Sequence, residues 1–318
     1  MRAALALGSG GARGYAHIGA IQVLEERGFE IVSVAGSSMG ALVGGLYAAG
    51  TLDEYAEWVQ SLSQLDVLRQ FELSLTAPGM FRVDKVFARM GELLGGALIE
   101  DLRVRFTAVA TDLLASKTVW FQRGPVEAAV RASIAIPGVF TPVMLNGRVL
   151  VDGGISDPVP TAAIASARAD VTIAVDLGGD RSGSADGSPA RETAAERPVK
   201  EWAGRFRRNA GHLLDRDAVH SFLSHLRGAQ RAGVDAEDPV DEARPEALPA
   251  GLGTLDVMNL SMEAVQRVVA RYRLAGNPPD VLVTVPRDAC RTLDFHRATE
   301  MIALGRTLTT EALDRRPA

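Results

Sequence analysis

The sequence predicts an α/β protein in which helices cover both faces of a mostly parallel sheet, a three-layer α/β/α sandwich. Short apolar runs with the length of strands alternate with segments of helical periodicity, and this alternation favours parallel strands joined by helices. Two such units stand at the amino terminus, where apolar runs at 3–7 and 31–35 each pass through a glycine-containing turn into a helical pattern. Further strands are expected at 106–110, 119–121, 149–151, 171–175 and 281–285.

The first strand–turn–helix unit carries a glycine-rich loop, Gly8-Ser9-Gly10-Gly11-Ala12-Arg13-Gly14. A dinucleotide-binding loop would need a glycine where Arg13 stands, and a phosphate-binding P-loop would need a Lys-Ser or Lys-Thr pair, which is absent. The backbone N–H groups of Gly10 and Gly11, at the positive end of a helix, are instead suited to stabilise an oxyanion.

The second unit carries a GxSxG motif, Gly36-Ser37-Ser38-Met39-Gly40, between the strand and a helical stretch at 41–49. A serine at the apex of such a turn has its hydroxyl pushed out of the backbone, and the flanking Gly36 and Gly40 leave room for neighbouring backbone. Both loops are expected to leave adjacent parallel strands at the same edge of the sheet. We therefore expect Ser38 to be a nucleophile beside the glycine loop.

A nucleophilic serine needs a base, and the sequence offers two kinds. Asp152 ends the apolar run 149–151 and is followed by Gly153 and Gly154. A carboxylate is a weaker base than imidazole, with a free pKa of about 3.9 against about 6.5, so a Ser–Asp pair depends on desolvation and close geometry. An aspartate that only opens a turn is the alternative. None of the five histidines has a convincing setting; they are His17, His212, His220, His225 and His296.

Together these motifs resemble the bacterial patatin-like phospholipases, and more closely the branch that includes the neuropathy-target-esterase-like and RssA-like proteins. The resemblance covers most of the chain and implies one patatin-like domain over residues 1–318. It rests on the glycine loop, on the GxSxG motif, and on the stretches at 110–113, 132–140 and 152–154.

The resemblance also implies a mechanism without histidine, metal or cofactor. Asp152 would act as the general base that takes the proton of Ser38 as the serine oxygen attacks an ester carbonyl. The N–H groups of Gly10 and Gly11 would hold the oxyanion, and water would then release the acyl group. The implied substrate is an acyl ester of a lipid, as for a phospholipase or lysophospholipase.

Two positions depart from the family pattern, and a third has two interpretations. Ser9 stands where the oxyanion motif is expected to begin with glycine, and Asp157 stands where asparagine often follows the Asp-Gly-Gly turn. Neither change removes a backbone donor or the Ser–Asp pair. Arg13 either braces the glycine loop or binds a lipid phosphate, and the brace is favoured because the helix dipole disfavours a cation at that end.

Composition and charge exclude several classes of function. The net charge of −5 and the pI near 5.6 give no electrostatic footprint for nucleic acid. One cysteine, Cys290, excludes an internal disulfide, and no zinc-like cluster of Cys and His is present. The uncharged run 31–52 contains glycines and serines that fit a strand, turn and helix better than a membrane span. We expect a cytoplasmic protein whose membrane contact, at the inner face, is peripheral.

The stretch between the last two predicted strands differs in composition from the rest. Residues 178–198 are rich in Gly, Ser, Ala and charge, and 228–253 are acidic and contain prolines, so both are predicted to be flexible loops. Between them, 199–227 combines apolar residues with arginines, as in a lid or a surface that meets anionic lipid. An amphipathic helical pair packed on the main domain is the alternative. The prediction is a helical and flexible insertion at 178–253.

Two other functions remain open. A conventional α/β-hydrolase would combine Ser38 with Asp176 and His296, although a nucleophile on the second strand is early for the usual order of that fold. A regulatory or lipid-sensing protein would keep the site with negligible turnover. Phospholipids, lysophospholipids, acylglycerols and short-chain esters all present a carbonyl to the same pair of residues, so the motifs do not choose among them.

Overall fold

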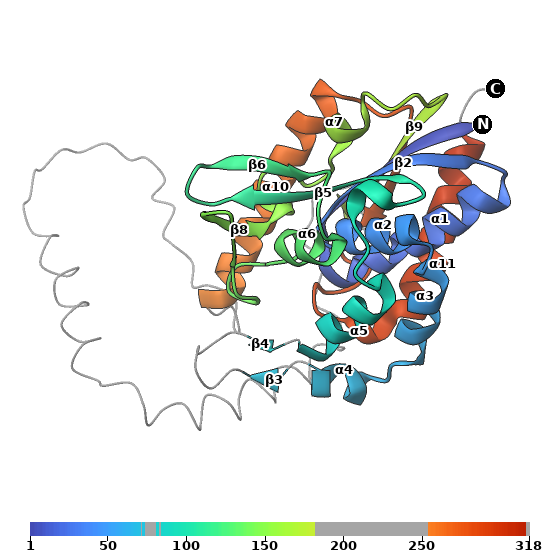
Figure 1. The fold of residues 1–318 in the computed structure, drawn as a ribbon. Helices are drawn as coiled ribbons and strands as arrows, with labels where there is room; N and C mark the ends of the chain where they lie inside the picture. The colour runs from blue at the N-terminus through green and yellow to red at the C-terminus, as the bar shows by residue number, and fades with distance from the viewer. Residues whose placement is uncertain (71, 74–80, 83, 182–253, 316–318) are drawn as a thin grey trace, which may run out of the picture. The chain divides into compact units, whose positions relative to one another are not determined.

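The computed structural model describes residues 1–70, 72–73, 81–82, 84–181 and 254–315 (Figure 1). Almost all of them belong to one compact unit, formed by Met1–Ala185 and Asn259–Ala318. A second unit, Asp186–Met258, is described only at 254–258. The predicted insertion at 178–253, with its segment 199–227, lies outside the described residues except at 178–181.

An eight-stranded sheet lies at the centre of the first unit. Its strands are β1 (Arg2–Leu7), β2 (Glu30–Ser37), β5 (Arg105–Asp112), β6 (Lys117–Phe121), β7 (Val143–Leu145), β8 (Arg148–Asp152), β9 (Val171–Gly179) and β10 (Val281–Pro286). They lie in the order β10-β9-β1-β2-β5-β8-β7, and β6 pairs with β5. The pairings from β10 to β5 are parallel, and those among β5, β6, β7 and β8 are antiparallel. A separate two-stranded sheet joins β3 (Glu72–Leu73) and β4 (Phe81–Arg82).

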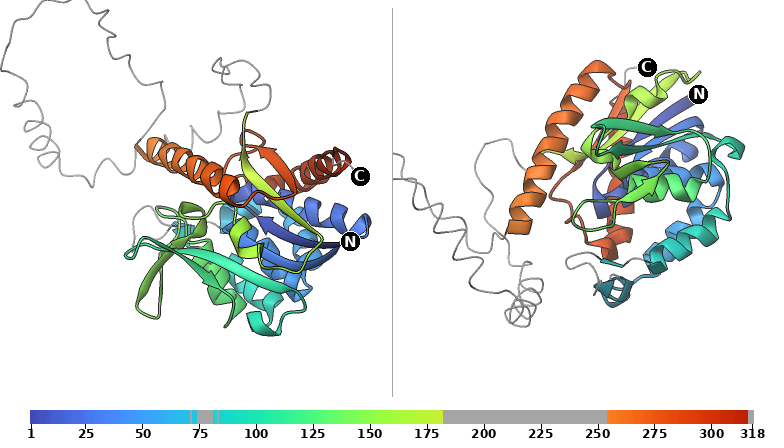
Figure 2. Two further views of the ribbon diagram at one scale, coloured as in Figure 1. Left: turned by 90° about the horizontal axis from the view of Figure 1, so that it is seen from above. Right: turned by 60° about the vertical axis from the view of Figure 1, so that its left-hand side comes forward.

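Helices cover both faces of the large sheet, which confirms the predicted α/β architecture. Ala3, Leu5 and Leu7 of β1 belong to the core that includes residues of α1, α2 and α11, whereas Ala4 and Ala6 belong to the cluster formed with α7 and α10. Figure 2 shows α10 (orange) and α11 (red) on different sides of the strands. The helices are α1 (Ala16–Glu26), α2 (Met39–Ala49), α3 (Leu52–Ser61), α4 (Gln64–Gln70), α5 (Asp84–Leu94), α6 (Val126–Ser133), α7 (Thr161–Ile164), α10 (Thr254–Gly276) and α11 (Ala298–Asp314).

The structure differs from the predicted loop at its first two residues, where the insertion was expected to begin at about 178. Gly178 and Gly179 belong to β9, whose pairing with β10 continues to Gly179 opposite Pro286. An added Cβ at Gly179 would lie 2.5 Å from Thr284 Cγ2, so the neighbouring strand approaches too closely for a larger residue. Gly179, one of the glycines that suggested a loop, therefore allows close strand packing instead.

Helices α1 and α11 approach each other through glycines. A Cβ added at Gly19 would lie 2.0 Å from the carbonyl oxygen of Ile302, and one added at Gly305 would lie 2.1 Å from the carbonyl oxygen of Ala16. These distances leave no space for a methyl group between the two backbones. The pair of helices can pack this closely only because both positions are glycine.

We predict that Gly305→Ala lowers the free energy of unfolding by roughly 1–3 kcal/mol, because the new methyl group forces α11 away from α1. Urea unfolding followed by circular dichroism measures this change. Gly276→Ala is the matched control, since a Cβ at the end of α10 meets nothing within 4 Å. Equal losses of stability in the two variants would contradict this account of the helix contact.

Candidate active site

Ser38 stands at the turn between β2 and α2. Its φ of 56° and ψ of −123° lie outside the regions that residues other than glycine favour. An added Cβ at Gly36 would lie 2.1 Å from the carbonyl oxygen of Gly40, and one at Gly40 would lie 2.1 Å from that of Leu7. Only glycines therefore allow this turn, and a strained serine stands at its apex, as in a nucleophile turn.

The side chain of Ser38 is hydrogen-bonded to Asp152. Ser38 Oγ donates to Asp152 Oδ2 over 2.5 Å, and the two residues have exposed fractions of 2% and 3%. Asp152 is the last residue of β8, and its Oδ1 accepts the N–H of Gly154 over 2.7 Å. One carboxylate oxygen is therefore fixed by the backbone, and the other faces the serine hydroxyl.

Burial raises the pKa of Asp152 from 3.8 to about 6, although the hydrogen bonds from Ser38 and Gly154 oppose this shift. Since the pKa in the folded protein is the higher one, the carboxyl contributes its full stability below a pH of about 4. That contribution is lost as the pH rises through about 6. Above this pH the group is a carboxylate that can accept a proton.

The turn after Asp152 packs directly on β5 and on the glycine loop. A Cβ added at Gly153 would lie 2.1 Å from the carbonyl oxygen of Val109, and one at Gly154 would lie 2.5 Å from Ser9 Oγ. Larger residues at either position would push the turn away from its neighbours. These glycines therefore bring the Asp152 turn into contact with the loop that follows β1.

The glycine loop runs from β1 into a 3-10 helix at Gly11–Tyr15. The N–H groups of Ser9 and Ala12 donate to carbonyl oxygens elsewhere in the fold, over 2.8 and 2.9 Å. The N–H groups of Gly10 and Gly11 are not donors in any hydrogen bond between the described residues. A φ of 56° at Gly11 also requires glycine there. The loop thus offers two adjacent donors, the arrangement that binding of an oxyanion requires.

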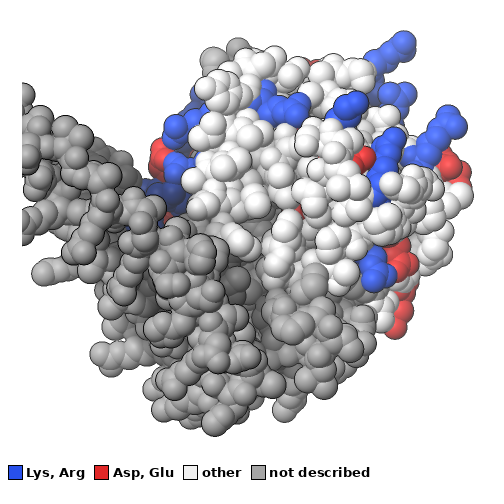
Figure 3. Space-filling view, turned by 90° about the vertical axis from the view of Figure 1, so that its left-hand side faces the viewer, with Lys and Arg blue, Asp and Glu red and all other residues white. Residues whose placement is uncertain are grey.

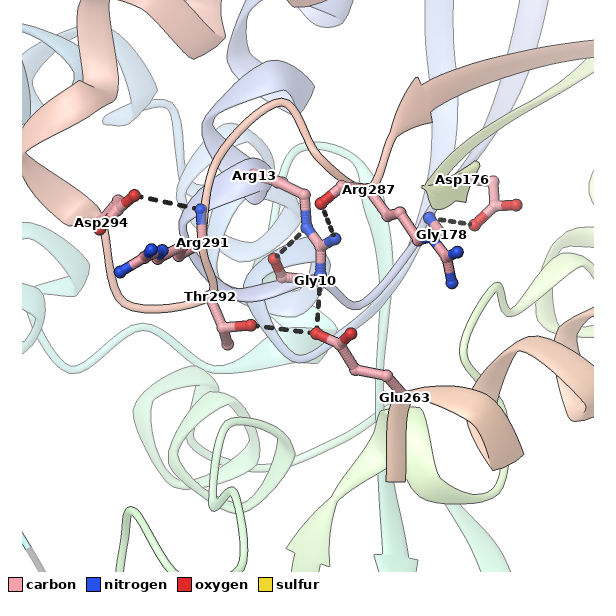
Figure 4. Close-up of polar contacts among 9 residues, drawn as sticks. All are labelled: Gly10, Arg13, Asp176, Gly178, Glu263, Arg287, Arg291, Thr292 and Asp294. Carbon is pink, nitrogen blue, oxygen red and sulfur yellow. Dashed lines mark hydrogen bonds and ion pairs between the residues drawn. The ribbon is translucent and has the colours of Figure 1, made fainter. Parts of the chain in front are cut away.

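Arg13 is buried behind the glycine loop, with three contacts around its guanidinium group (Figure 4). Its Nε donates to Gly10 O over 3.2 Å, and its Nη1 donates to Arg287 O over 2.7 Å. Its Nη2 lies 3.4 Å from Glu263 Oε1, in an ion pair. These contacts join the loop to Arg287, the residue after β10, and to α10, which is the geometry of a brace.

Ser133, at the end of α6, holds the backbone of Ser38 in place. Its Oγ accepts the N–H of Ser38 over 2.9 Å and donates to the carbonyl oxygen of Val109 over 2.5 Å. No role for Ser133 follows from the sequence, although it lies in one of the stretches that resemble the patatin-like family. Ser133 is 95 residues from Ser38 in the chain, so their contact can be recognised only from the folded structure.

Asp157, one of the two departures from the family pattern, is buried without hydrogen bonds to its carboxylate among the described residues. Burial raises its pKa to about 6, and the charge of Arg273 opposes the shift. Two carboxyls in this region, Asp152 and Asp157, therefore titrate in the same range of pH.

The described histidines do not hydrogen-bond Ser38. The Nε2 of His17 lies 2.8 Å from Gly8 O, and burial lowers the pKa of this imidazole to about 4. His296 lies in a 3-10 helix, Phe295–Arg297, that packs against α3 and α4. Asp176 instead accepts the N–H of Gly178 over 2.8 Å. The residues of the triad alternative are therefore not hydrogen-bonded to one another in the structure. Outside the described residues lie His212, His220 and His225.

A sequence model of the patatin-like phospholipase family matches residues 5–165, half of the chain, and this range includes both Ser38 and Asp152. The chain belongs to this family. An uncharacterized NTE family protein of Mycobacterium tuberculosis (strain ATCC 25618 / H37Rv) is 49% identical over 98% of this chain and 91% of its own length. The resemblance stated from the motifs is confirmed.

Two fungal relatives of the chain carry a named activity. Lysophospholipase nte1 of Emericella nidulans is 35% identical over 55% of this chain, and Lysophospholipase NTE1 of Phaeosphaeria nodorum is 35% identical over 95%. The matches span 12% and 18% of those longer proteins. Among solved structures, VipD from Legionella pneumophila has a TM-score of 0.44 at 14% identity, over 99% of this chain and 67% of its own.

Family membership supports hydrolysis of lipids as the general activity of this patatin-like protein. Within the part of the chain that the structure describes, no helix combines the length and the apolar character needed to cross a membrane.

We predict that Ser133→Ala lowers both turnover and stability, the latter by about 1–3 kcal/mol, because it leaves the Ser38 N–H and the Val109 carbonyl without their partner. Turnover of a p-nitrophenyl ester and urea unfolding measure the two effects. Ser37→Ala is the matched control, since Ser37 is buried next to Ser38 and its hydroxyl has no partner among the described residues. Full activity of Ser133→Ala would contradict the role given to Ser133.

Proposed function

We propose that the protein is a serine hydrolase that cleaves acyl esters of lipids through a dyad of Ser38 and Asp152. The hydrogen bond of 2.5 Å from Ser38 Oγ to Asp152 Oδ2 carries the proposal. It lies in a buried site, with the serine on a strained turn at the amino end of α2. Membership of the patatin-like phospholipase family supports a lipid as the substrate class.

In the proposed acylation step, Asp152 removes the proton of Ser38 while the serine oxygen forms a bond to the ester carbonyl carbon. The raised pKa of Asp152 makes it a stronger base than an exposed aspartate. The Gly154 N–H keeps the carboxylate oriented toward the serine. The proton then passes from Asp152 to the leaving alcohol as the tetrahedral intermediate collapses to the acyl-enzyme.

The N–H groups of Gly10 and Gly11 would stabilise the negative oxygen of the tetrahedral intermediate. Two observations support this role. Neither N–H group donates to an acceptor among the described residues, and Arg13 Nε donates to the carbonyl oxygen of Gly10, which fixes the loop. Donors fixed in advance do not reorganise when charge develops, which is the main advantage of such a site. In deacylation, Asp152 would activate a water molecule in the same way as it activates Ser38.

Lysophospholipids are the first substrates to test, since the fungal relatives are named lysophospholipases. With Ser38 only 2% exposed, the ester carbonyl of a substrate has little access to the hydroxyl in this structure. We propose that contact with a micelle or a vesicle increases this access, so we expect higher activity on aggregated lipid than on a monomeric ester.

We predict that Ser38→Ala and Asp152→Asn each lower kcat by about a thousandfold or more while the fold is retained, since each removes one partner of a unit. Hydrolysis of a p-nitrophenyl acyl ester and of a lysophospholipid measures the loss, and circular dichroism checks folding. The triad alternative makes the opposite forecast for His296→Ala. That variant keeps near-normal turnover if Asp152 is the base, and loses it if His296 is.

Absence of turnover in the folded wild-type protein, with lipid binding unaffected by Ser38→Ala, would favour the regulatory alternative over hydrolysis.

We predict that kcat/KM falls as the pH decreases through about 6, by about tenfold per pH unit, because only the ionised form of Asp152 accepts the serine proton. The rate profile of a p-nitrophenyl ester between pH 4 and 8, roughly, measures the titration. Asp157→Asn is the control, since the pKa of Asp157 is also about 6. This variant should keep the fall in kcat/KM near pH 6. If the fall disappears in Asp157→Asn, then Asp157 and not Asp152 causes it.

A further inference from the structure

Helix α10 turns a largely polar side toward the domain. Ala270 belongs to the same apolar cluster as Ala4 of β1. The inner side also carries Glu263, Gln266 and Arg267, which line a cavity of about 260 Å³ between the helix and the carboxyl ends of the strands. The sequence at 260–276 contains one acidic residue, Glu263, and it faces inward, where it forms an ion pair with Arg13.

The opposite side of α10 is apolar and exposed. Val265, Val268 and Tyr272 have exposed fractions of 53%, 52% and 77%. Their spacing of three and four residues puts them on one face of the helix. The exposed Arg271, three residues from Val268, lies at the edge between this face and the cavity, which it also lines. We refer to these four residues, Val265, Val268, Tyr272 and Arg271, as the outer face of α10.

This distribution is the reverse of the one that a surface helix normally shows, in which the apolar side faces the core and the polar side faces water. Exposed apolar side chains that adjoin one another on one face usually mark a site of interaction. The outer face carries one formal charge, that of Arg271, and it is positive. A partner for this face therefore has an apolar layer next to negative charge.

The apolar surface continues onto the neighbouring strand β6. Nη2 of Arg273 donates to Thr118 Oγ1 over 3.2 Å, so the helix lies beside this strand. Trp120 is two residues from Thr118, hence on the same side of the strand, and is 43% exposed. In Figure 3, the described part of the face that includes α10 and β6 is mostly uncharged, with Lys and Arg side chains along its upper part.

We propose that the outer face of α10, together with Trp120, is a docking surface for a lipid bilayer that contains anionic lipid. Valine side chains enter the apolar boundary of a bilayer, and tyrosine and tryptophan favour the level of the headgroups. Arg271 adds attraction to negatively charged headgroups. The face is a convex helix surface, which a fluid bilayer can accommodate. The proposal extends the proposed function, because docking would bring a lipid hydrolase to its substrate.

Vesicle co-sedimentation tests this proposal with the full chain carrying Ser38→Ala, so that no lipid is consumed during the measurement. The vesicles contain phosphatidylcholine alone or with about 30% phosphatidylglycerol. We expect binding to the anionic vesicles that weakens about tenfold or more in the variant Val265→Glu with Val268→Glu. Arg271→Gln is expected to weaken binding about fivefold, and only for vesicles with phosphatidylglycerol.

Leu65→Glu is the matched control, because Leu65 is an exposed leucine of α4, 64% exposed, outside the proposed surface. Its binding should equal that of the parent protein. Absence of vesicle binding by the parent overturns the proposal, and so does unchanged binding by the double valine variant. A change of molecular mass in light scattering without a change in vesicle binding would assign the face to a second copy of the chain and would also overturn it.

Vesicle binding and hydrolysis can fail separately, which keeps this proposal distinct from the proposed function. Turnover of a water-soluble p-nitrophenyl ester by the otherwise wild-type double valine variant should be unchanged, since neither valine lies in the proposed dyad or the glycine loop. Vesicle binding with no turnover on any ester would support the docking surface and reject the dyad.

Discussion

The hydrogen bond between Ser38 and Asp152 joins residues 114 positions apart in the chain, and much of the fold can be understood as the means of forming it. Ser38 follows β2 and Asp152 ends β8, and both strands pair with β5 between them. A shift in either pairing would separate the two side chains. The sheet register is therefore the constraint on which the candidate site depends.

Close backbone approach is the second constraint, and glycine satisfies it. Gly36 and Gly40 allow the strained turn at Ser38, and Gly153 and Gly154 allow the Asp152 turn to pack on β5 and the glycine loop. The guanidinium group of Arg13 then joins that loop to Arg287, just after β10, and to Glu263 of α10. The three segments of the site are thus held by contacts in which a single added methyl group would force a displacement.

Much of this arrangement could be predicted from the sequence, because the informative signals were local. The GxSxG motif and the Asp-Gly-Gly turn each follow an apolar run, so the elements that carry Ser38 and Asp152 could be recognised from adjacent residues. Ser133 could not be found this way, since its contact with Ser38 depends on how α6 lies beside β5. The outer face of α10 was missed for a similar reason, because helical periodicity alone does not tell which side of a helix meets the domain.

The central claim is that Ser38 is a nucleophile made reactive by Asp152, and covalent labelling tests it most directly. A fluorophosphonate ester would be incubated with the folded protein, and the modified residue would be located by mass spectrometry. The account predicts one adduct, on Ser38, and a labelling rate lower by about a hundredfold or more in Asp152→Asn. An unmodified Ser38, or labelling of Asp152→Asn at the wild-type rate, would contradict it.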